Sequence, residues 1–276
     1  MDVIDVLQVY APLALAVFAI GIAPKFIRWG RGVLAGGTFS GRSKNEIDSP
    51  ERESPLRALG RVLYKPMTFS SGANASWTAG YALYHVGIIT IFAGYSLAAV
   101  ILGANLLLGN PVPNMATGEF TQQLSLVNLL AIVFGNAESP AREFLFGPAA
   151  PVFLGVTWIA VISAFLGNVA LFGNAFRNKG AIVGDIHEAA RGFRTSGRFS
   201  LEHVLITGLV FGIVITELLA RLASSVPAIP HTMLYYHLLL AMTIVVLTPF
   251  TFLKHIVFFP ITLYYATRRR VTRTVA

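Results

Sequence analysis

Long apolar segments are the feature that most restricts how this chain can fold. Several stretches approach or exceed 18 residues, and in the last one, 231–270, Lys254 is the single charged residue before the terminal arginines. Apolar runs of this length are typical of transmembrane helices. Lipid leaves only helices and closed barrels as spanning structures, and these runs are too long for barrel strands. The sequence therefore predicts an all-α, polytopic membrane bundle.

The composition supports this prediction and excludes several cofactors. Of the 276 residues, 55% are hydrophobic and 12% are charged, whereas soluble domains carry about 25% charged residues. The chain has no cysteine, which excludes iron–sulfur clusters, c-type haem, thiolate metal sites and disulfides within it. An electron carrier in this chain would therefore need histidine ligands, and any iron–sulfur cluster would belong to a partner.

Five transmembrane helices are expected in one domain, 1–276, at about residues 9–24, 78–108, 148–176, 203–223 and 231–270. A polar, basic loop, 25–77, would separate the first two. The segment 109–147 would join the second and third, and its residues 124–135 are apolar but too short to cross a bilayer. They predict a short re-entrant or surface helix before the third span.

The distribution of positive charge predicts the orientation. Segments 25–77, 177–203 and 268–276 hold 18 of the 21 Lys and Arg residues, and five spans would put all three on one side. Basic residues mark the cytoplasmic side of a membrane. The N-terminus is therefore expected outside and the C-terminus in the cytoplasm. Membrane orientation accounts for most of the net charge of +8 without a nucleic-acid partner.

Three histidines lie inside expected spans, where ionisable side chains usually face a bundle interior or a functional site. His237 and His255 are 18 residues apart, or five whole helical turns, so they would share one face about 27 Å apart. His85 would lie level with His255 near the cytoplasmic side, and such a pair can hold a b-type haem. Tyr95, ten residues beyond His85, would lie level with His237. Gly87 would leave room beside His85 for a macrocycle or for a close helix contact.

Two spans carry motifs that resemble a known family. Tyr84–Tyr95 reads YHVGIITIFAGY and resembles the first ligand helix of the respiratory nitrate reductase gamma subunit. Tyr236–Leu263, with two histidines and a proline between them, is similar to the last helix of that family. The wider group includes the membrane cytochrome subunits of heterodisulfide reductase and of related sulfite-reduction complexes. The resemblance implies a multi-pass protein of the inner (cytoplasmic) membrane of a prokaryote.

The resemblance also implies a ligand set. His85 and His255 would be the axial ligands of one haem b. His237 and the residue at Tyr95 would hold a second haem, but the family has histidine where this chain has Tyr95. Three outcomes are open: a five-coordinate haem on His237, a haem that uses Tyr95 or another ligand, or no second haem. Arg142 falls where the family has a basic quinol-site residue, and an ion pair with Glu138 fits its position equally well.

The expected function is electron transfer between a membrane quinol or quinone and an iron–sulfur subunit that feeds a catalytic subunit on the cytoplasmic side. The whole complex would be an oxidoreductase of the nitrate or heterodisulfide reductase type, with electrons flowing in either direction. The alternatives are a proton-coupled transporter, which requires acidic residues deep in the spans, and a haem-free membrane anchor. Glu217 is the acidic residue found within a span, but it lies near the outer end of that span, which counts against the transporter, and its i,i+4 spacing with Arg221 indicates a structural ion pair.

Overall fold

The computed structural model describes residues 2–34, 46–52, 75–138, 140–177, 201–223, 232–251, 253, 257 and 270–274. Its long helices are α1 (Val3–Leu34), α3 (Ala75–Leu107), α6 (Ala150–Arg177), α8 (Leu201–Ala223) and α9 (Met233–Leu247). Shorter elements join α3 to α6, namely β2 (Val112–Pro113), β3 (Phe120–Thr121), α4 (Leu126–Phe134), α5 (Ala141–Phe146) and the 3₁₀ helix η1 (Gly147–Ala149). β1 (Glu46–Arg52) pairs antiparallel with β4 (Arg270–Thr274), and β2 pairs antiparallel with β3.

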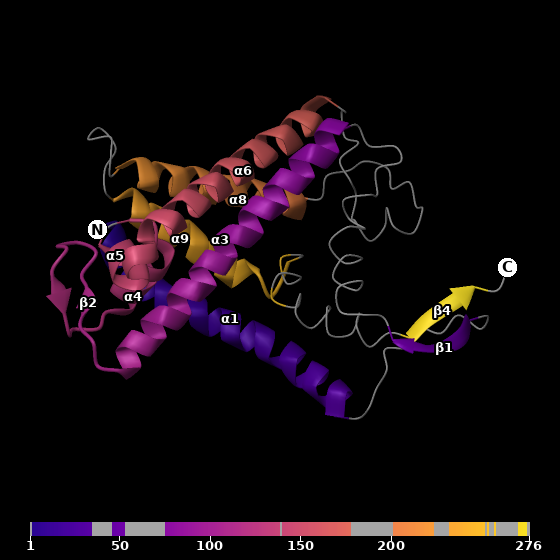
Figure 1. Ribbon diagram of the computed structural model, residues 1–276, viewed down its shortest axis with the longest axis horizontal. Helices are drawn as coiled ribbons and strands as arrows, with labels where there is room; N and C mark the ends of the chain where they lie inside the picture. The colour runs from indigo at the N-terminus through magenta and orange to yellow at the C-terminus, as the bar shows by residue number, and fades with distance from the viewer. Residues whose placement is uncertain are drawn as a thin grey trace.

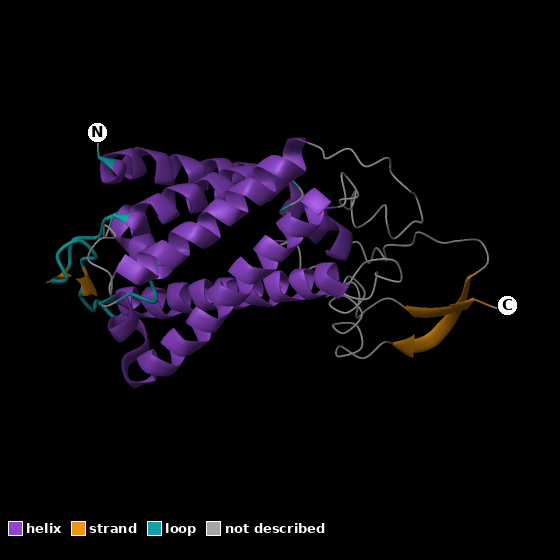
Figure 2. Cartoon of the chain, turned by 90° about the horizontal axis from the view of Figure 1, so that it is seen from above, coloured by secondary structure: helices purple, strands orange, loops and turns teal. Residues whose placement is uncertain are grey.

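The long helices form a bundle in which consecutive members run in opposite directions (Figure 1). The N-terminus, α4, α5 and the β2–β3 hairpin lie at one end, and the β1–β4 pair lies at the other (Figures 1 and 2). α3 packs mainly on α6, whereas α9 packs on both α8 and α1. Elements from the start and the end of the chain therefore lie side by side.

Four helical segments are long and apolar enough to cross a membrane: Val3–Arg28, Ala79–Leu107, Ala141–Gly173 and Leu205–Ala223. Between 22% and 33% of the residues in their most apolar windows are buried within the molecule. Much of the remainder is large and apolar, and Ile20, Val100 and Val152 are 74%, 70% and 71% exposed. Soluble proteins rarely expose apolar surface on this scale. The chain is a multi-pass helical membrane protein whose outer faces suit lipid.

Glycines bring α3 and α6 into direct backbone contact. A Cβ atom added to Gly87 would lie 2.5 Å from both the carbonyl oxygen of Ala160 and the backbone nitrogen of Ala164. One added to Gly167 would meet the backbone nitrogen of Tyr84 even more closely. Small residues allow this close approach in membrane helix pairs generally. Gly87 therefore serves helix packing, which is one of the two uses that the sequence allowed.

The segment expected to contain a surface or re-entrant helix, 109–147, holds both α4 and α5. α4 is nine residues long and buries Val127, Ala131 and Ile132. It packs against α1, α3 and α9. The short helix thus contributes to the core of the bundle at the end that also carries the N-terminus (Figure 1).

The first helix differs from the predicted range of 9–24. α1 starts at Val3 and continues to Leu34, with Asp5 in its first turn and Arg31 in its last turn. Acidic residues at a helix start and basic residues at its end interact favourably with the helix dipole, which explains the extension into polar sequence. The expected loop 25–77 therefore begins inside a helix, and its residues 35–45 and 53–74 lie outside the described residues.

The single helix predicted over 231–270 is interrupted. α9 ends at Leu247, and turns follow over residues 248–250. Pro249 has no N–H to donate to the preceding turn, and its ring crowds that turn. The Nζ atom of Lys25 donates a hydrogen bond to the carbonyl oxygen of Pro249, which satisfies an acceptor where the helix has ended. Five whole helical turns therefore do not separate His237 from His255, and His255 lies outside the described residues.

Candidate functional site

A polar cluster lies inside the bundle, between α3, α8 and α9. His237 of α9 is at its centre and has 0% exposure. Its Nδ1 lies 3.2 Å from the carbonyl oxygen of Ile213 and 3.3 Å from Oγ1 of Thr216, both on α8. Its Nε2 lies 3.2 Å from Oη of Tyr95 and 3.2 Å from Oε2 of Glu217. Both ring nitrogens therefore have protein partners.

Glu217 and Arg221 of α8 form the ion pair that their spacing predicts. Nε and Nη2 of Arg221 lie 2.8 Å and 2.5 Å from Oε1 of Glu217. Nη1 donates a hydrogen bond of 2.8 Å to Oγ1 of Thr157 on α6, and the guanidinium lies 5.9 Å from the ring centroid of Trp158. The two charged side chains are 5% and 3% exposed. A buried charge needs a partner of this kind, so the pair allows an acidic residue deep in the bundle.

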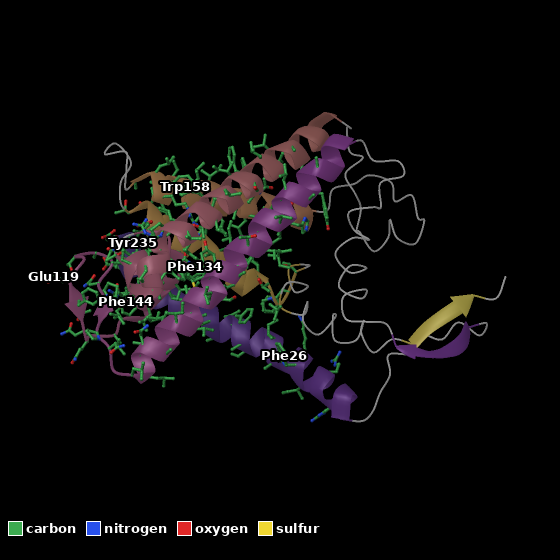
Figure 3. The ribbon with its side chains drawn as sticks, in the orientation of Figure 1. Phe26, Glu119, Phe134, Phe144, Trp158 and Tyr235 are labelled. Atoms are coloured by element: carbon green, nitrogen blue, oxygen red, sulfur yellow. The ribbon has the colours of Figure 1, made fainter. Side chains whose placement is uncertain are left out.

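Tyr95 of α3 connects the ion pair to the histidine. Its Oη lies 3.3 Å from Oε2 of Glu217 as well as 3.2 Å from Nε2 of His237. Its ring packs against Phe134 of α4, with the ring centroids 4.8 Å apart; Figure 3 labels Phe134 and also Trp158, the neighbour of Arg221. The prediction that Tyr95 and His237 lie level with each other is confirmed by this contact. The four residues Tyr95, Glu217, Arg221 and His237 are termed the His237 cluster below.

A second haem does not fit the His237 cluster. An axial ligand offers iron the lone pair of one ring nitrogen, but Nδ1 of His237 faces a carbonyl oxygen and Nε2 faces Tyr95 and Glu217. The ring centroids of Tyr95 and His237 are 6.5 Å apart, and a hydrogen bond joins the two side chains. Of the three outcomes left open by the sequence, this geometry favours the absence of a second haem.

His85 lies on α3, ten residues before Tyr95, and its own helix holds the ring. Nδ1 lies 2.9 Å from the carbonyl oxygen of Tyr81. Because a carbonyl only accepts, this contact places the hydrogen on Nδ1 and the lone pair on Nε2. Metal-binding histidines are commonly oriented through such a bond. The Nδ1 bond of His85 is of this kind, and the expected second ligand, His255, lies outside the described residues.

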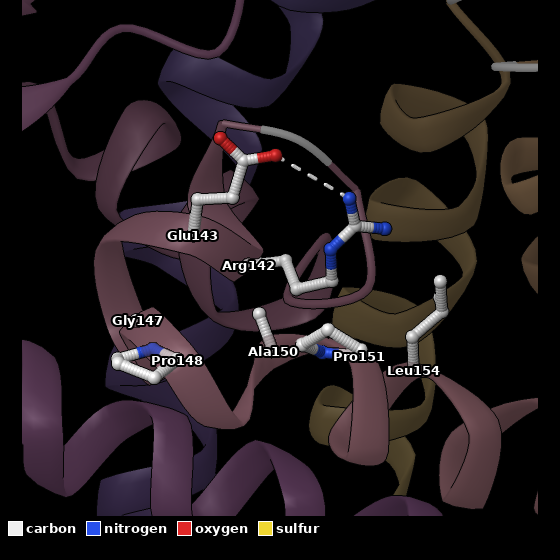
Figure 4. A pocket seen from close by; sticks show the side chains of 7 residues that line it. All are labelled: Arg142, Glu143, Gly147, Pro148, Ala150, Pro151 and Leu154. Carbon is white, nitrogen blue, oxygen red and sulfur yellow. Dashed lines mark hydrogen bonds and ion pairs between the residues drawn. The ribbon is translucent and has the colours of Figure 1, made fainter.

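Arg142 of α5 lines a pocket of about 290 Å³ at the end of the bundle that carries α4 (Figure 4). The other lining residues are Glu143, Gly147, Pro148, Ala150, Pro151 and Leu154. The guanidinium donates a hydrogen bond of 3.2 Å to the carbonyl oxygen of Ala137 and forms an ion pair of 3.4 Å with Glu143. The partner of Arg142 in this pair is thus Glu143, whereas Glu138 was the partner considered from the sequence.

Asn136, in the turn after α4, is a buried residue that sequence reasoning missed. It is 1% exposed, and neither Nδ2 nor Oδ1 has a hydrogen-bond partner among the described residues. Its Nδ2 points toward Gly94, the residue before Tyr95, and would lie 3.9 Å from a Cβ atom there. No short motif marks this position, because the burial of a turn results from tertiary packing.

Glu138, two residues later, was considered only as a partner of Arg142. Burial and, to a lesser extent, the charge of Glu217 raise the pKa of its carboxyl group to about 8, against the opposing effect of Arg221. Glu138 shares the turn after α4 with Asn136, and its backbone N–H donates a hydrogen bond of 2.9 Å to the carbonyl oxygen of Gly135. The turn thus carries an ionisable group whose pKa responds to the charges of Glu217 and Arg221.

Comparison with known proteins assigns no family. No protein-family model, no curated protein and no solved structure matches the chain. Within the described part of the chain, no group of three or more His, Cys, Asp or Glu side chains is placed to hold a metal ion. The fold and the site define a multi-pass helical membrane protein with a buried polar cluster.

Proposed function

We propose that this chain is the haem b-containing membrane subunit of a respiratory oxidoreductase. It would pass electrons between a membrane quinol or quinone and an iron–sulfur partner. The observation that carries the proposal is His85, on a membrane-spanning helix, with Nδ1 bonded to the carbonyl oxygen of Tyr81 at 2.9 Å. Histidines inside spans usually have functional roles, and a bond of this kind commonly orients a metal-binding histidine. The motifs similar to the nitrate reductase gamma family support the same function.

His85 and His255 would hold the haem, which supplies a reversible one-electron carrier when bound. The carbonyl oxygen of Tyr81 keeps the His85 ring in one tautomer and one orientation. Tyr84 packs edge-on against that ring, with the centroids 5.0 Å apart. Gly87 fixes α3 against α6 one turn beyond Tyr84. These contacts would hold the ligand helix in register.

Arg142 and Glu143 are the groups proposed to bind the quinol head. Their pocket combines an ion pair with the apolar side chains of Pro148, Pro151 and Leu154. A lipophilic carrier with polar hydroxyl groups suits a site of this composition. The carboxylate of Glu143 is 64% exposed, so it could pass a proton between the carrier and water.

The proposed topology has five spans, with α9 and the residues that follow it forming the fifth. The end with the N-terminus and α4 would face outward, and α4 would lie near that surface. The opposite, basic end would face the cytoplasm, because positive charge marks that side. An iron–sulfur subunit and a catalytic subunit would dock there, with lipid around the helices. The expected location is the inner membrane of a prokaryote.

A proton-coupled transporter is the second candidate. It is favoured by the position of Glu217, which is 4% exposed and bonded to Arg221, Tyr95 and His237. An acidic residue deep within the bundle is what this class requires. A haem-free membrane anchor would account for the helices but gives no role to these buried polar groups.

A reduced-minus-oxidised visible spectrum of the purified full chain tests the proposal. We expect the sharp α-band of a low-spin b-type haem, since two histidine ligands produce that state. His85→Ala should lose the band while circular dichroism shows unchanged helicity. His187→Ala, in the basic segment 177–203, is the control and should keep it. A featureless spectrum from wild-type protein made with ample haem would leave the transporter or the anchor.

A further inference from the structure

We propose that the His237 cluster binds one exchangeable proton and reaches the α4–α5 end of the bundle through Asn136 and Glu138. This site occupies the position where the sequence suggested a second haem. The inference does not rest on the haem proposed at His85, because every group that it uses lies in the described part of the chain.

The donors and acceptors around His237 explain why an additional proton fits there. Nδ1 faces the carbonyl oxygen of Ile213, so Nδ1 carries a hydrogen and Nε2 of the neutral ring is an acceptor. Tyr95 has one hydroxyl hydrogen, which it can donate either to Nε2 or to Oε2 of Glu217, but not fully to both. Nε2 and Oε2 are 3.2 Å apart. Two acceptors would therefore face each other at contact distance unless a further proton lies between them.

Either partner can carry that proton. On His237 it produces an imidazolium that donates to Glu217, and on Glu217 it produces a carboxyl group that donates to Nε2. In both states Oε1 of Glu217 keeps its two hydrogen bonds from Arg221, and Arg221 keeps its bond to Thr157. The step moves one proton and no electrons. Because the surrounding bonds stay in place, the proton can move between His237 and Glu217 without rearrangement of the cluster.

Asn136 marks a route into the cluster. Buried polar groups are almost always hydrogen-bonded, and water serves where the protein offers no partner. Both polar atoms of Asn136 lack a protein partner. Gly94 has no side chain. A Cβ atom added there would lie 3.4 Å from Cζ of Phe153 and 3.9 Å from Nδ2 of Asn136. A water bound to Asn136 would thus lie beside the residue that precedes Tyr95.

Glu138 connects this route to the end of the bundle. The charged groups that act on it are Glu217 and Arg221 of α8, and it interacts electrostatically with Tyr235 of α9. Its carbonyl oxygen accepts the backbone N–H of Arg142. With a pKa raised to about 8 by burial and by Glu217, its carboxyl group can exchange a proton near neutral pH.

Infrared spectra of the purified full chain at increasing pH test the link between Glu138 and the cluster. We expect a protonated-carboxyl band that disappears as the pH rises through about 8 and that is absent from Glu138→Gln. Glu217→Gln should lower the midpoint by about one pH unit or more, because Arg221 then favours the ionised carboxylate unopposed. Glu119→Gln changes an exposed residue of the β2–β3 hairpin and should leave the midpoint unchanged. If Glu217→Gln leaves the midpoint of the Glu138 band unchanged, the proposed link between Glu138 and the His237 cluster is wrong.

Deuterium exchange of the Tyr95 hydroxyl tests the route. The signal is the tyrosine infrared band that is lost in Tyr95→Phe. Asn136→Leu should slow the exchange several-fold, because an apolar side chain of similar volume replaces the water-binding amide. Asn168→Leu is the matched control: Asn168 is also 1% exposed with an unpartnered Nδ2, but it lies on α6 about 16 Å beyond Thr157. Equal rates in the two leucine variants overturn the route.

Haem quantitation separates this inference from the proposed function. His237→Ala should leave the haem content of the chain unchanged, whether the wild-type protein holds haem or not. Loss of one haem equivalent in this variant would make His237 a ligand and would overturn the proton site. A wild-type protein without haem would defeat the proposed function alone, because neither infrared experiment depends on haem.

Discussion

Glu217 carries its charge inside the bundle because Arg221 lies beside it. Two nitrogens of the guanidinium bond to Oε1 of Glu217, and a third bonds to Thr157. Moving each ion out of water costs several kcal/mol, and the attraction between them offsets that cost only while both are present. The two residues therefore depend on each other for stability.

Arg221→Met should lower the free energy of unfolding by about 3–5 kcal/mol, because it removes the guanidinium that pairs with the buried carboxylate of Glu217. The double variant Glu217→Met/Arg221→Met should lie much closer to wild type. Thermal unfolding in detergent, followed by circular dichroism, measures both. Arg142→Met breaks an ion pair with the 64% exposed Glu143 and should cost about 1 kcal/mol or less. Equal losses in the single and double variants would contradict the interdependence.

Counting helical turns was enough to place Tyr95 level with His237, and the two side chains do meet at 3.2 Å. The same counting gave no information about what lies between them. Both a direct hydrogen bond and a haem held between the two side chains require Tyr95 and His237 to lie at the same depth in the bundle. Asn136 and Glu138 were harder still. Both belong to a turn, and their burial depends on how that turn packs against other elements, which no local pattern encodes.

Among the helices, the close contact between α3 and α6 depends on glycines, which have no side chain to hold the two backbones apart. Gly87 of α3 lies against the backbone of Ala160 and Ala164, and Gly167 of α6 lies against the backbone of Tyr84. Backbone atoms cannot rotate away as a side chain can. The two helices therefore tolerate no additional carbon at these positions without moving apart.

Gly87→Ala should destabilise the protein by about 1–3 kcal/mol, since its Cβ would meet Ala160 and Ala164 at 2.5 Å. Gly103→Ala is the matched control on the same helix, where a Cβ would meet nothing within 4 Å. There the change should be neutral or stabilise by about 0.5–1 kcal/mol, because alanine favours the helix. The unfolding temperatures of the two variants, measured in detergent, show whether the packing at Gly87 excludes a Cβ atom. Shifts of the same sign and size would argue against close packing.

The apolar runs predicted α3, α6 and α8 to within a few residues, because hydrophobic length alone defines such helices. They did not predict where α9 ends. A proline is tolerated inside a membrane helix when neighbours satisfy the freed backbone groups, so Pro249 did not by itself mark a stop. Here a neighbour satisfies the carbonyl oxygen after the helix has ended, and that neighbour, Lys25, is 224 residues away in the chain.

For the whole molecule, the two ends of the bundle differ in charge. Segments 25–77, 177–203 and 268–276 contain most of the Lys and Arg residues, and the described parts of the first and last of these include the paired strands β1 and β4. The opposite end carries α4, α5 and the pocket at Arg142 (Figures 1 and 4). This asymmetry is the basis of the proposed orientation.

Single cysteines test that orientation cleanly, because the chain contains none. Ala116→Cys, at an exposed position between β2 and β3, should react with a membrane-impermeant maleimide on intact cells. Ser43→Cys, within the basic segment 25–77, should react only after the membrane is permeabilised, since positive charge is retained on the cytoplasmic side. Labelling with the opposite pattern would invert the topology. It would also place the partner subunits on the other side.

The bond from Lys25 to Pro249 has a consequence for biogenesis. α1 leaves the ribosome before the other described helices, so Lys25 is made long before its acceptor, while α3, α6 and α8 are still to be synthesised. Only when α9 arrives beside it does the amine meet its acceptor. A variant that lacks α1 would still contain α3, α6, α8 and α9. The carbonyl oxygen of Pro249, where α9 has ended, would then lack the hydrogen bond from Lys25. The contact between α1 and the end of α9 is thereby completed only after the four earlier long helices have been made.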